Sequence, residues 1–149
     1  MRGIKHSVYV LIVLLMAAFN TIAQTNEERQ ERADKLFEKG QYVEATKDYL
    51  HLLSLKPKDY DLNFKYGTCL LFNSNRKSEA IRYLNYAILD ESVDPRAYYF
   101  HGMALHLNYQ FAEAQRSYGT YLNLTGNKQD ERYKADRQIQ MCKNGKKLL

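Results

Sequence analysis

Proline, glycine and cysteine are all scarce in this chain. Its 149 residues include two prolines, seven glycines and two cysteines, whereas aromatic residues reach 13%. This composition excludes collagen-like and low-complexity disordered chains. Two cysteines without a CxxC pair can neither frame a disulfide-rich mini-protein nor hold zinc through such a pair. We therefore expect one folded domain, with Cys69 and Cys142 as buried free thiols, because the length is too short for a multi-domain enzyme.

The sequence also lacks the motifs of common catalytic and metal sites. It contains no HExxH, no histidine pair at i and i+4, no GxSxG and no glycine-rich phosphate loop. Acidic pairs such as Asp59 and Asp61 fall where helices are expected to begin, so capping explains them. His101 falls at a packing position. We predict no catalytic residue, no metal, no cofactor and no small-molecule substrate.

The only long apolar run lies near the N-terminus, from Val8 to Phe19, after the basic residues Arg2 and Lys5. Together with the small residues before Gln24, this pattern predicts a secretory signal peptide over 1–23, cleaved after Ala23. An uncleaved anchor is the alternative, although the run is shorter than the roughly 20 residues of a membrane-spanning helix. We expect the mature chain to be periplasmic or otherwise exported to the cell envelope, without a stable membrane anchor.

Positive charge is concentrated at the C-terminal end of the chain. Residues 24–127 carry 13 basic and 14 acidic residues, whereas residues 128–149 carry seven basic and three acidic residues. A nucleic-acid-binding domain is expected to show a basic stripe on its folded surface. The charge pattern therefore predicts no nucleic-acid partner.

A short phrase recurs three times with a fixed period. Residues 40–49 match residues 109–118, and residues 76–84 carry a related pattern between them. The Glu-Ala pairs in these phrases end at Ala45, Ala80 and Ala114, which are 35 and 34 residues apart. Periods of this size indicate stacked helical hairpins, each made of two amphipathic helices.

These units resemble the tetratricopeptide repeat (TPR) family. The signature positions of that family are matched in the third unit by Tyr98, Gly102, Leu105, Ala114, Tyr118 and Tyr121, and in the first unit by Ala33, Leu36, Ala45, Tyr49 and Pro57. The second unit is the least regular. The resemblance implies an all-α fold, a right-handed α-solenoid of three TPR helical hairpins plus a C-terminal capping helix. The expected domain spans 24–149, with repeats at about 26–59, 60–93 and 94–127.

The capping helix is expected over 128–147, with Asn127 as its N-cap and Gly145 at its end. Ala135, Ile139 and Cys142 would face the last repeat, since a repeat array needs a polar-backed terminal helix. The phrase at 137–146 is similar to the stretch that closes the N-terminal repeat segment of certain Gram-negative envelope proteins. In those proteins a β-propeller and an OmpA-like peptidoglycan-binding domain follow, and this sequence has no counterpart of either.

The resemblance also implies a concave inner face that binds an extended or helical peptide. The predicted partner-binding residues, taken from the first helix of each unit, are Gln30, Asp34, Phe37, Phe64, Thr68, Arg96, Tyr99, Met103 and His106. Glu38, Leu71 and Phe72 extend this set, and simple packing between helices is an equal alternative for Leu71 and Phe72. The Lys and Asn clamp of chaperone-binding TPR domains is absent at the matching positions, so a C-terminal acidic peptide is not the expected ligand.

Two functional hypotheses follow from these patterns. The first is an exported TPR scaffold or adaptor that binds a protein or peptide partner in the bacterial cell envelope. The alternative is a stand-alone or truncated N-terminal module of an OmpA-like, wall-associated envelope protein, acting in a secretion, motility or peptidoglycan-linked assembly. Neither hypothesis requires an enzymatic activity.

Overall fold

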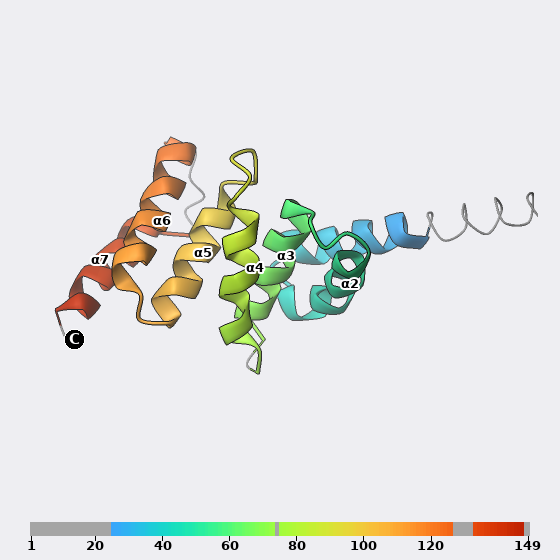
Figure 1. Cartoon of the computed structure of the whole chain (residues 1–149), viewed down its shortest axis with the longest axis horizontal. Helices are drawn as coiled ribbons and strands as arrows, with labels where there is room; N and C mark the ends of the chain where they lie inside the picture. Colours follow the sequence, from blue (N-terminus) through green and yellow to red (C-terminus); the bar gives the residue numbers. More distant parts are fainter. Residues whose placement is uncertain (1–24, 74, 127–132, 148–149) are drawn as a thin grey trace, which may run out of the picture.

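The part of this computed structural model that is described covers residues 25–73, 75–126 and 133–147, where helices are joined by turns and loops and no strand occurs. A first helix occupies 25–38. The remaining elements are α2 (Tyr42–Leu55), α3 (Tyr60–Leu71), the 3-10 turn η1 (Lys77–Glu79), α4 (Ala80–Ala87), α5 (Arg96–Leu107), α6 (Phe111–Thr125) and α7 (Ala135–Lys146). The helices follow one another along the long axis of the molecule (Figure 1). The predicted signal peptide over 1–23 and the predicted cap Asn127 lie outside the described residues.

The helices pair as hairpins and stack in chain order. Helix α3 packs against α4, α5 against α6, and α6 against α7, and α3 also contacts α5 directly. The first helix, α3, α5 and α7 therefore form the side that we call the inner face, and α2, α4 and α6 form the outer layer. None of the helices in the described ranges is long and apolar enough to span a membrane.

Small residues set the distance between the two helices of a hairpin. Ala45, Ala80 and Ala114 are all fully buried. A Cβ atom added at Gly102 would lie 2.8 Å from the ring of Tyr118 on α6, which is closer than packed atoms come. The close helix crossing predicted from the repeat pattern is confirmed, because only a residue without a side chain leaves room for that ring.

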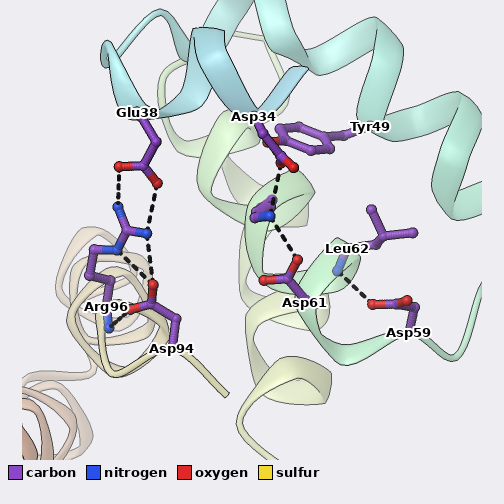
Figure 2. Close-up of polar contacts among 9 residues, drawn as sticks. Asp34, Glu38, Tyr49, Asp59, Asp61, Leu62, Asp94 and Arg96 are labelled. Atoms are coloured by element: carbon purple, nitrogen blue, oxygen red, sulfur yellow. Dashed lines mark hydrogen bonds and ion pairs between the residues drawn. The ribbon is translucent and has the colours of Figure 1, made fainter. Parts of the chain in front are cut away.

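Acidic residues begin two of the inner helices. The carboxylate of Asp59 accepts a hydrogen bond from the backbone N–H of Leu62, at 2.9 Å, at the start of α3 (Figure 2). Asp94 accepts one from the backbone N–H of Arg96, at 2.8 Å, at the start of α5. Each carboxylate satisfies an N–H group that has no partner within the helix. The predicted capping role is confirmed for Asp59, whereas the carboxylate of Asp61 pairs with Lys65.

The capping helix α7 begins later than predicted. Tyr133 and Lys134 lie outside the helix, and Lys134 has a φ of +41°, in the left-handed region that interrupts a right-handed helix. Helix α7 therefore starts at Ala135, and the continuous helix predicted over 128–147 is interrupted at Tyr133 and Lys134; residues 128–132 lie outside the described part of the chain. The periodicity of 128–147 did not reveal this break, because a single backbone angle ends a helix without changing the hydrophobic pattern.

Gly145 does not end α7, contrary to the prediction, since the helix continues to Lys146. A Cβ atom at this position would lie 2.7 Å from the ring of Phe111 on α6. Gly145 thus allows α7 to pack closely on α6. Ala135 and Cys142 are fully buried, so the predicted inward orientation of these two residues is correct.

Candidate functional site

The inner face divides into a polar half near the N-terminal helices and an apolar half near α7. In the polar half, Arg96 on α5 donates from Nη1 and Nη2 to the carboxylate of Glu38 on the first helix, at 3.0 and 2.8 Å. The same guanidinium lies 2.7 Å from Asp94 (Figure 2). Burial alone would lower the pKa of Arg96, but the hydrogen bonds to Asp94 and Glu38 outweigh it and raise the pKa. This cluster joins the first helix to α5.

A second charged cluster joins the first helix to α3. The ammonium of Lys65 donates to Asp34 at 2.8 Å and lies 2.8 Å from Asp61. The hydroxyl of Tyr49 donates to Asp34 at 2.7 Å (Figure 2). Burial and then the bond to Asp34 raise the pKa of Tyr49, whereas for Lys65 the two carboxylates overcome the opposing effect of burial and raise its pKa. The charges in this half are compensated within the chain.

Four of the predicted partner-binding residues are buried in the core. Phe37 is 2% exposed, Tyr99 is 4% exposed, and Phe64 and Thr68 are fully buried. The rings of Phe37 and Phe64 lie 5.5 Å apart, edge to face. The structure does not place these four side chains on an open surface, contrary to the prediction. The rings of Phe37, Phe64 and Phe100 pack where the first helix, α3 and α5 meet, and the ring of Tyr133 covers Tyr99. Gln30 and Asp34 are half-buried, and the guanidinium of Arg96 is paired with Glu38 and Asp94.

The other two predicted residues, Met103 and His106, line a groove in the apolar half. The groove has a volume of about 460 Å³ and lies between the end of α3, the second half of α5 and the face of α7. The residues that line this α3–α5–α7 groove are Leu71, Phe72, Lys77, Met103, His106, Leu107, Tyr118, Gln138 and Met141. Phe72, Leu107 and Met141 are 43%, 52% and 47% exposed, so large apolar side chains form its accessible rim.

Several groove residues were not identified from the sequence. Gln138 and Met141 belong to α7. For this helix the sequence pattern predicted only the residues that face the last repeat. Lys77 comes from the turn between α3 and α4, the least regular part of the repeat. The spacing of Gln138 and Met141, three residues apart on one helix, is the available signal, since i and i+3 share a face.

Tyr118 is the outer-layer residue that reaches the groove. It is fully buried, and its hydroxyl has no hydrogen-bond partner. Its ring passes over Gly102, so the outer helix α6 contributes to a surface built mainly from inner helices. Burial, together with the neighbouring Tyr99 and Cys142, raises the pKa of Tyr118. A buried hydroxyl without a partner costs about 1 to 3 kcal/mol, so it is an unusual feature of this surface.

Tyr133, just before α7, covers the neighbouring aromatic residues. It is 9% exposed, and its ring lies 4.7 Å from that of Tyr99 and 5.6 Å from that of Phe100. Tyr99 is therefore buried by a residue from a segment that the sequence pattern assigned to a continuous helix.

A buried histidine joins three helices behind the groove. His101 on α5 lies with Nδ1 2.8 Å from Ser117 Oγ on α6 and Nε2 2.6 Å from Asn85 Oδ1 on α4. The arrangement fits a neutral ring that donates to Asn85 and accepts from Ser117. Burial lowers the pKa of His101 to about 4. His101 and Ser117 are 7% and 8% exposed, so this network has a structural role, as predicted for His101.

The two cysteines are free and buried, as predicted. Burial raises the pKa of Cys69 to about 12 and also raises the pKa of Cys142, which keeps both thiols protonated. Among the described residues, no group of three or more His, Cys, Asp or Glu side chains is placed to hold a metal ion.

The helical hairpins, their small-residue crossings and their stacking define the fold of TPR domains. The structure is similar to the first TPR domain of Spaghetti (RPAP3) bound to the HSP90 peptide SRMEEVD, with a TM-score of 0.64 and 23% identity, covering 81% of this chain and 92% of that one. It is also similar to the Yersinia enterocolitica type III secretion chaperone SycD in complex with a peptide of the translocator YopD. There the TM-score is 0.64 at 21% identity, covering 83% of this chain and 95% of that one.

A third similar structure is the TPR domain of P58(IPK), with a TM-score of 0.67 and 18% identity over 84% of this chain and 34% of that one. No family model and no curated protein sequence matches the chain. At these identities the similarity establishes the fold. The predicted all-α solenoid of TPR hairpins is confirmed.

Proposed function

We propose that this chain is a TPR scaffold of the bacterial cell envelope that binds an apolar segment of a protein partner in the α3–α5–α7 groove. The observation that carries the proposal is the exposed apolar rim of Phe72, Leu107 and Met141 around a groove of about 460 Å³. Burying such side chains against a partner removes apolar surface from water and favours association. Methionine and aromatic side chains adapt to different apolar partners.

The fold supports a binding role in preference to a catalytic one. The first TPR domain of RPAP3 binds an HSP90 peptide in its structure, and SycD binds a peptide of the translocator YopD in its structure. In the present chain, the charges of the polar half are already paired within the protein. The groove is therefore the part of the inner face that offers exposed apolar surface to a partner. The proposed activity is therefore the binding of a protein segment, without catalysis.

The groove is tested by panning a random 12-residue peptide display library on the purified chain and measuring the selected peptides by calorimetry. We expect Phe72→Ala and Met141→Ala each to weaken binding about tenfold, because each change removes a large exposed apolar side chain that a partner would bury. Leu89→Ala is the matched control, since Leu89 is 67% exposed and does not line the groove. Selected peptides that bind equally well to the groove variants would contradict the proposal.

The envelope location rests on the sequence pattern of residues 1–23. We expect the protein recovered from the periplasmic or extracellular fraction to begin at Gln24, because the basic start, apolar run and small residues match a cleaved signal peptide. N-terminal sequencing of that protein is the measurement. Recovery of the chain with Met1 intact in the membrane pellet would instead support the uncleaved anchor.

The phrase at 137–146 favours one kind of envelope setting. It is similar to the stretch that closes the repeat segment of OmpA-like, wall-associated envelope proteins, and in this chain it forms α7, which supplies Gln138 and Met141 to the groove. We therefore place the partner in a secretion, motility or peptidoglycan-linked assembly. Crosslinking through a photoreactive group at position 141 in the envelope fraction would identify it.

A further inference from the structure

We propose that Tyr109, in the turn between α5 and α6, is a partner-binding residue that extends the α3–α5–α7 groove and receives a second large apolar side chain of the bound segment. This inference rests on the proposed function, because the same segment occupies the groove. It adds a contact outside the groove lining and gives the partner two apolar anchors in one stretch of chain.

Tyr109 has a backbone conformation that tyrosine rarely adopts. Its φ is +61°, in the left-handed region, where the Cβ atom of an L-residue crowds the following carbonyl oxygen. The first repeat has a glycine, Gly40, at the corresponding position, with a φ of +73°. A Cβ atom at Gly40 would meet no heavy atom within 4 Å beyond its own surroundings in the chain. The first repeat therefore uses glycine here for its backbone freedom and not to make room.

The hydrogen bonds show that the two turns have the same geometry. In the third repeat, the backbone N–H of Tyr109 donates to the carbonyl of His106 at 3.1 Å, and that of Gln110 donates to Leu105 at 3.0 Å. The first repeat has the corresponding two bonds, both 2.9 Å long, with Gly40 in place of Tyr109. These paired bonds close a helix in the Schellman motif, which favours glycine at the left-handed position. Tyrosine at this position is therefore unfavourable for the fold.

Packing within the chain does not offset this cost. Tyr109 is 72% exposed, and the contact of its ring with Phe111 is an edge contact, with ring centroids 6.1 Å apart. The ring thus contributes little to the core. Strained residues that do not stabilise the fold are typical of ligand-binding sites, where the strain is retained because the side chain is needed there.

A series of aromatic contacts connects Tyr109 to the groove. The ring of Phe111 also lies 5.5 Å from that of His106, which lines the groove. Leu107, another lining residue, is 52% exposed and precedes Tyr109 by two residues. Phe111 packs against Gly145, so the α5–α6 turn and the end of α7 lie at one edge of the molecule (Figure 1). Tyr109 therefore continues the exposed apolar rim of the groove beyond the end of α5.

The surroundings of Tyr109 define the side chain that it receives. Its ring neighbour is Phe111, and the adjoining rim of the groove includes Leu107 and Met141, so this surface is apolar. A tyrosine ring on such a surface packs against an aliphatic or aromatic side chain while its hydroxyl stays in water. A segment with one apolar anchor in the groove and a second one beyond Leu107 would cover both sites.

The test is Tyr109→Gly, which gives the third repeat the turn residue of the first. We expect the peptides selected from the random library to bind about fivefold to tenfold more weakly, because the second apolar contact is lost. The thermal midpoint of the free chain should stay unchanged or rise by about 2 to 5 °C, since glycine relieves the left-handed strain. Tyr109→Asn should weaken binding equally, because asparagine tolerates this conformation but lacks the ring.

Two further variants serve as controls. Tyr109→Phe keeps the ring and should retain the affinity within about twofold, because the contact is apolar. A loss as large as that of Tyr109→Gly would show that the hydroxyl makes the contact and would overturn the proposal. Leu89→Ala removes a side chain that is 67% exposed and outside the groove, and it should leave the affinity unchanged.

A double-mutant cycle identifies the second anchor on the peptide. Each large apolar residue of a selected peptide is replaced by alanine in turn, and binding is measured on the unaltered chain and on Tyr109→Gly. We expect one replacement to weaken binding about fivefold on the unaltered chain and less than about twofold on the variant, because its contact ring is already absent there. Selected peptides without any such coupled position would contradict the proposal.

The remaining outcomes also decide the matter. A lower thermal midpoint for Tyr109→Gly would show that the ring stabilises its own fold, and this would overturn the proposal. Sedimentation of the free chain provides the other check. A dimer that Tyr109→Gly dissociates, with unchanged peptide affinity, would assign the ring to a second copy of this chain and overturn the proposal as well.

The variants separate this inference from the proposed function. Peptides that depend on Phe72 and Met141, yet bind Tyr109→Gly as well as the unaltered chain, would overturn the inference and leave the binding groove intact. Peptides that ignore the Phe72 and Met141 variants as well would overturn the proposed function itself.

Discussion

Replacing Phe64 with alanine should lower the free energy of unfolding by about 3 to 5 kcal/mol, the usual cost of deleting a buried aromatic ring. Phe64 is fully buried on α3. Its ring lies 5.5 Å from that of Phe37 on the first helix and 6.3 Å from that of Phe100 on α5. The deletion therefore leaves a cavity where three inner helices meet.

Urea denaturation of the purified variants measures this effect. Leu89→Ala is the control, because Leu89 is 67% exposed and its truncation should change the free energy of unfolding by less than about 0.5 kcal/mol. Phe64→Leu should fall between the two, since it fills part of the cavity. Equal effects of Phe64→Ala and Leu89→Ala would show that Phe64 is solvent-accessible and would restore it as a surface residue.

Acidification should destabilise the fold through His101, by about 2 kcal/mol between pH 7 and pH 5. The pKa of His101 is lowered to about 4 by burial, whereas an unfolded histidine titrates near 6.5. Below pH 6.5 the unfolded chain binds a proton that the folded chain excludes, so stability falls as pH decreases towards 4. Above pH 7 both states are neutral, and this contribution is constant.

The comparison with His101→Gln isolates this effect from other groups. Burial also lowers the pKa of His106, which destabilises the fold in the same direction, and the carboxyl of Asp48 has a lowered pKa and contributes only at more acidic pH. In His101→Gln, the loss between pH 7 and pH 5 should shrink by about 2 kcal/mol, whereas His106→Gln should retain most of it. Parallel pH profiles for the unaltered chain and His101→Gln would contradict the assignment.

The hairpin architecture was predictable because it depends on local and periodic features of the sequence. Ala45, Ala80 and Ala114 recur at the period of a helical hairpin, and all three are fully buried. Gly102 lies where the ring of Tyr118 crosses α5. Such positions are constrained by the nearest helix alone, so a repeat pattern identifies them without knowledge of the rest of the molecule.

The exposure of the inner-face residues was not predictable in the same way. Periodicity shows that Phe64 and Met103 lie on apolar stripes of their helices, but both stripes look alike in sequence. Phe64 is buried because its ring packs between that of Phe37 on the first helix and that of Phe100 on α5. Met103 lines a groove because the corresponding neighbour, α7, leaves space beside it.

The amino-acid sequence by itself determined the helices, their pairing as hairpins and the small residues at their crossings, because these depend on contacts between elements adjacent in the chain. Only the tertiary structure decided which inner-face residues are buried and which line the α3–α5–α7 groove. Lys134 has a left-handed backbone and starts α7 late, and Tyr133 covers Tyr99 and Phe100. The groove is formed by residues from helices that are distant in sequence. The spacing of residues within one helix cannot predict how closely such helices pack.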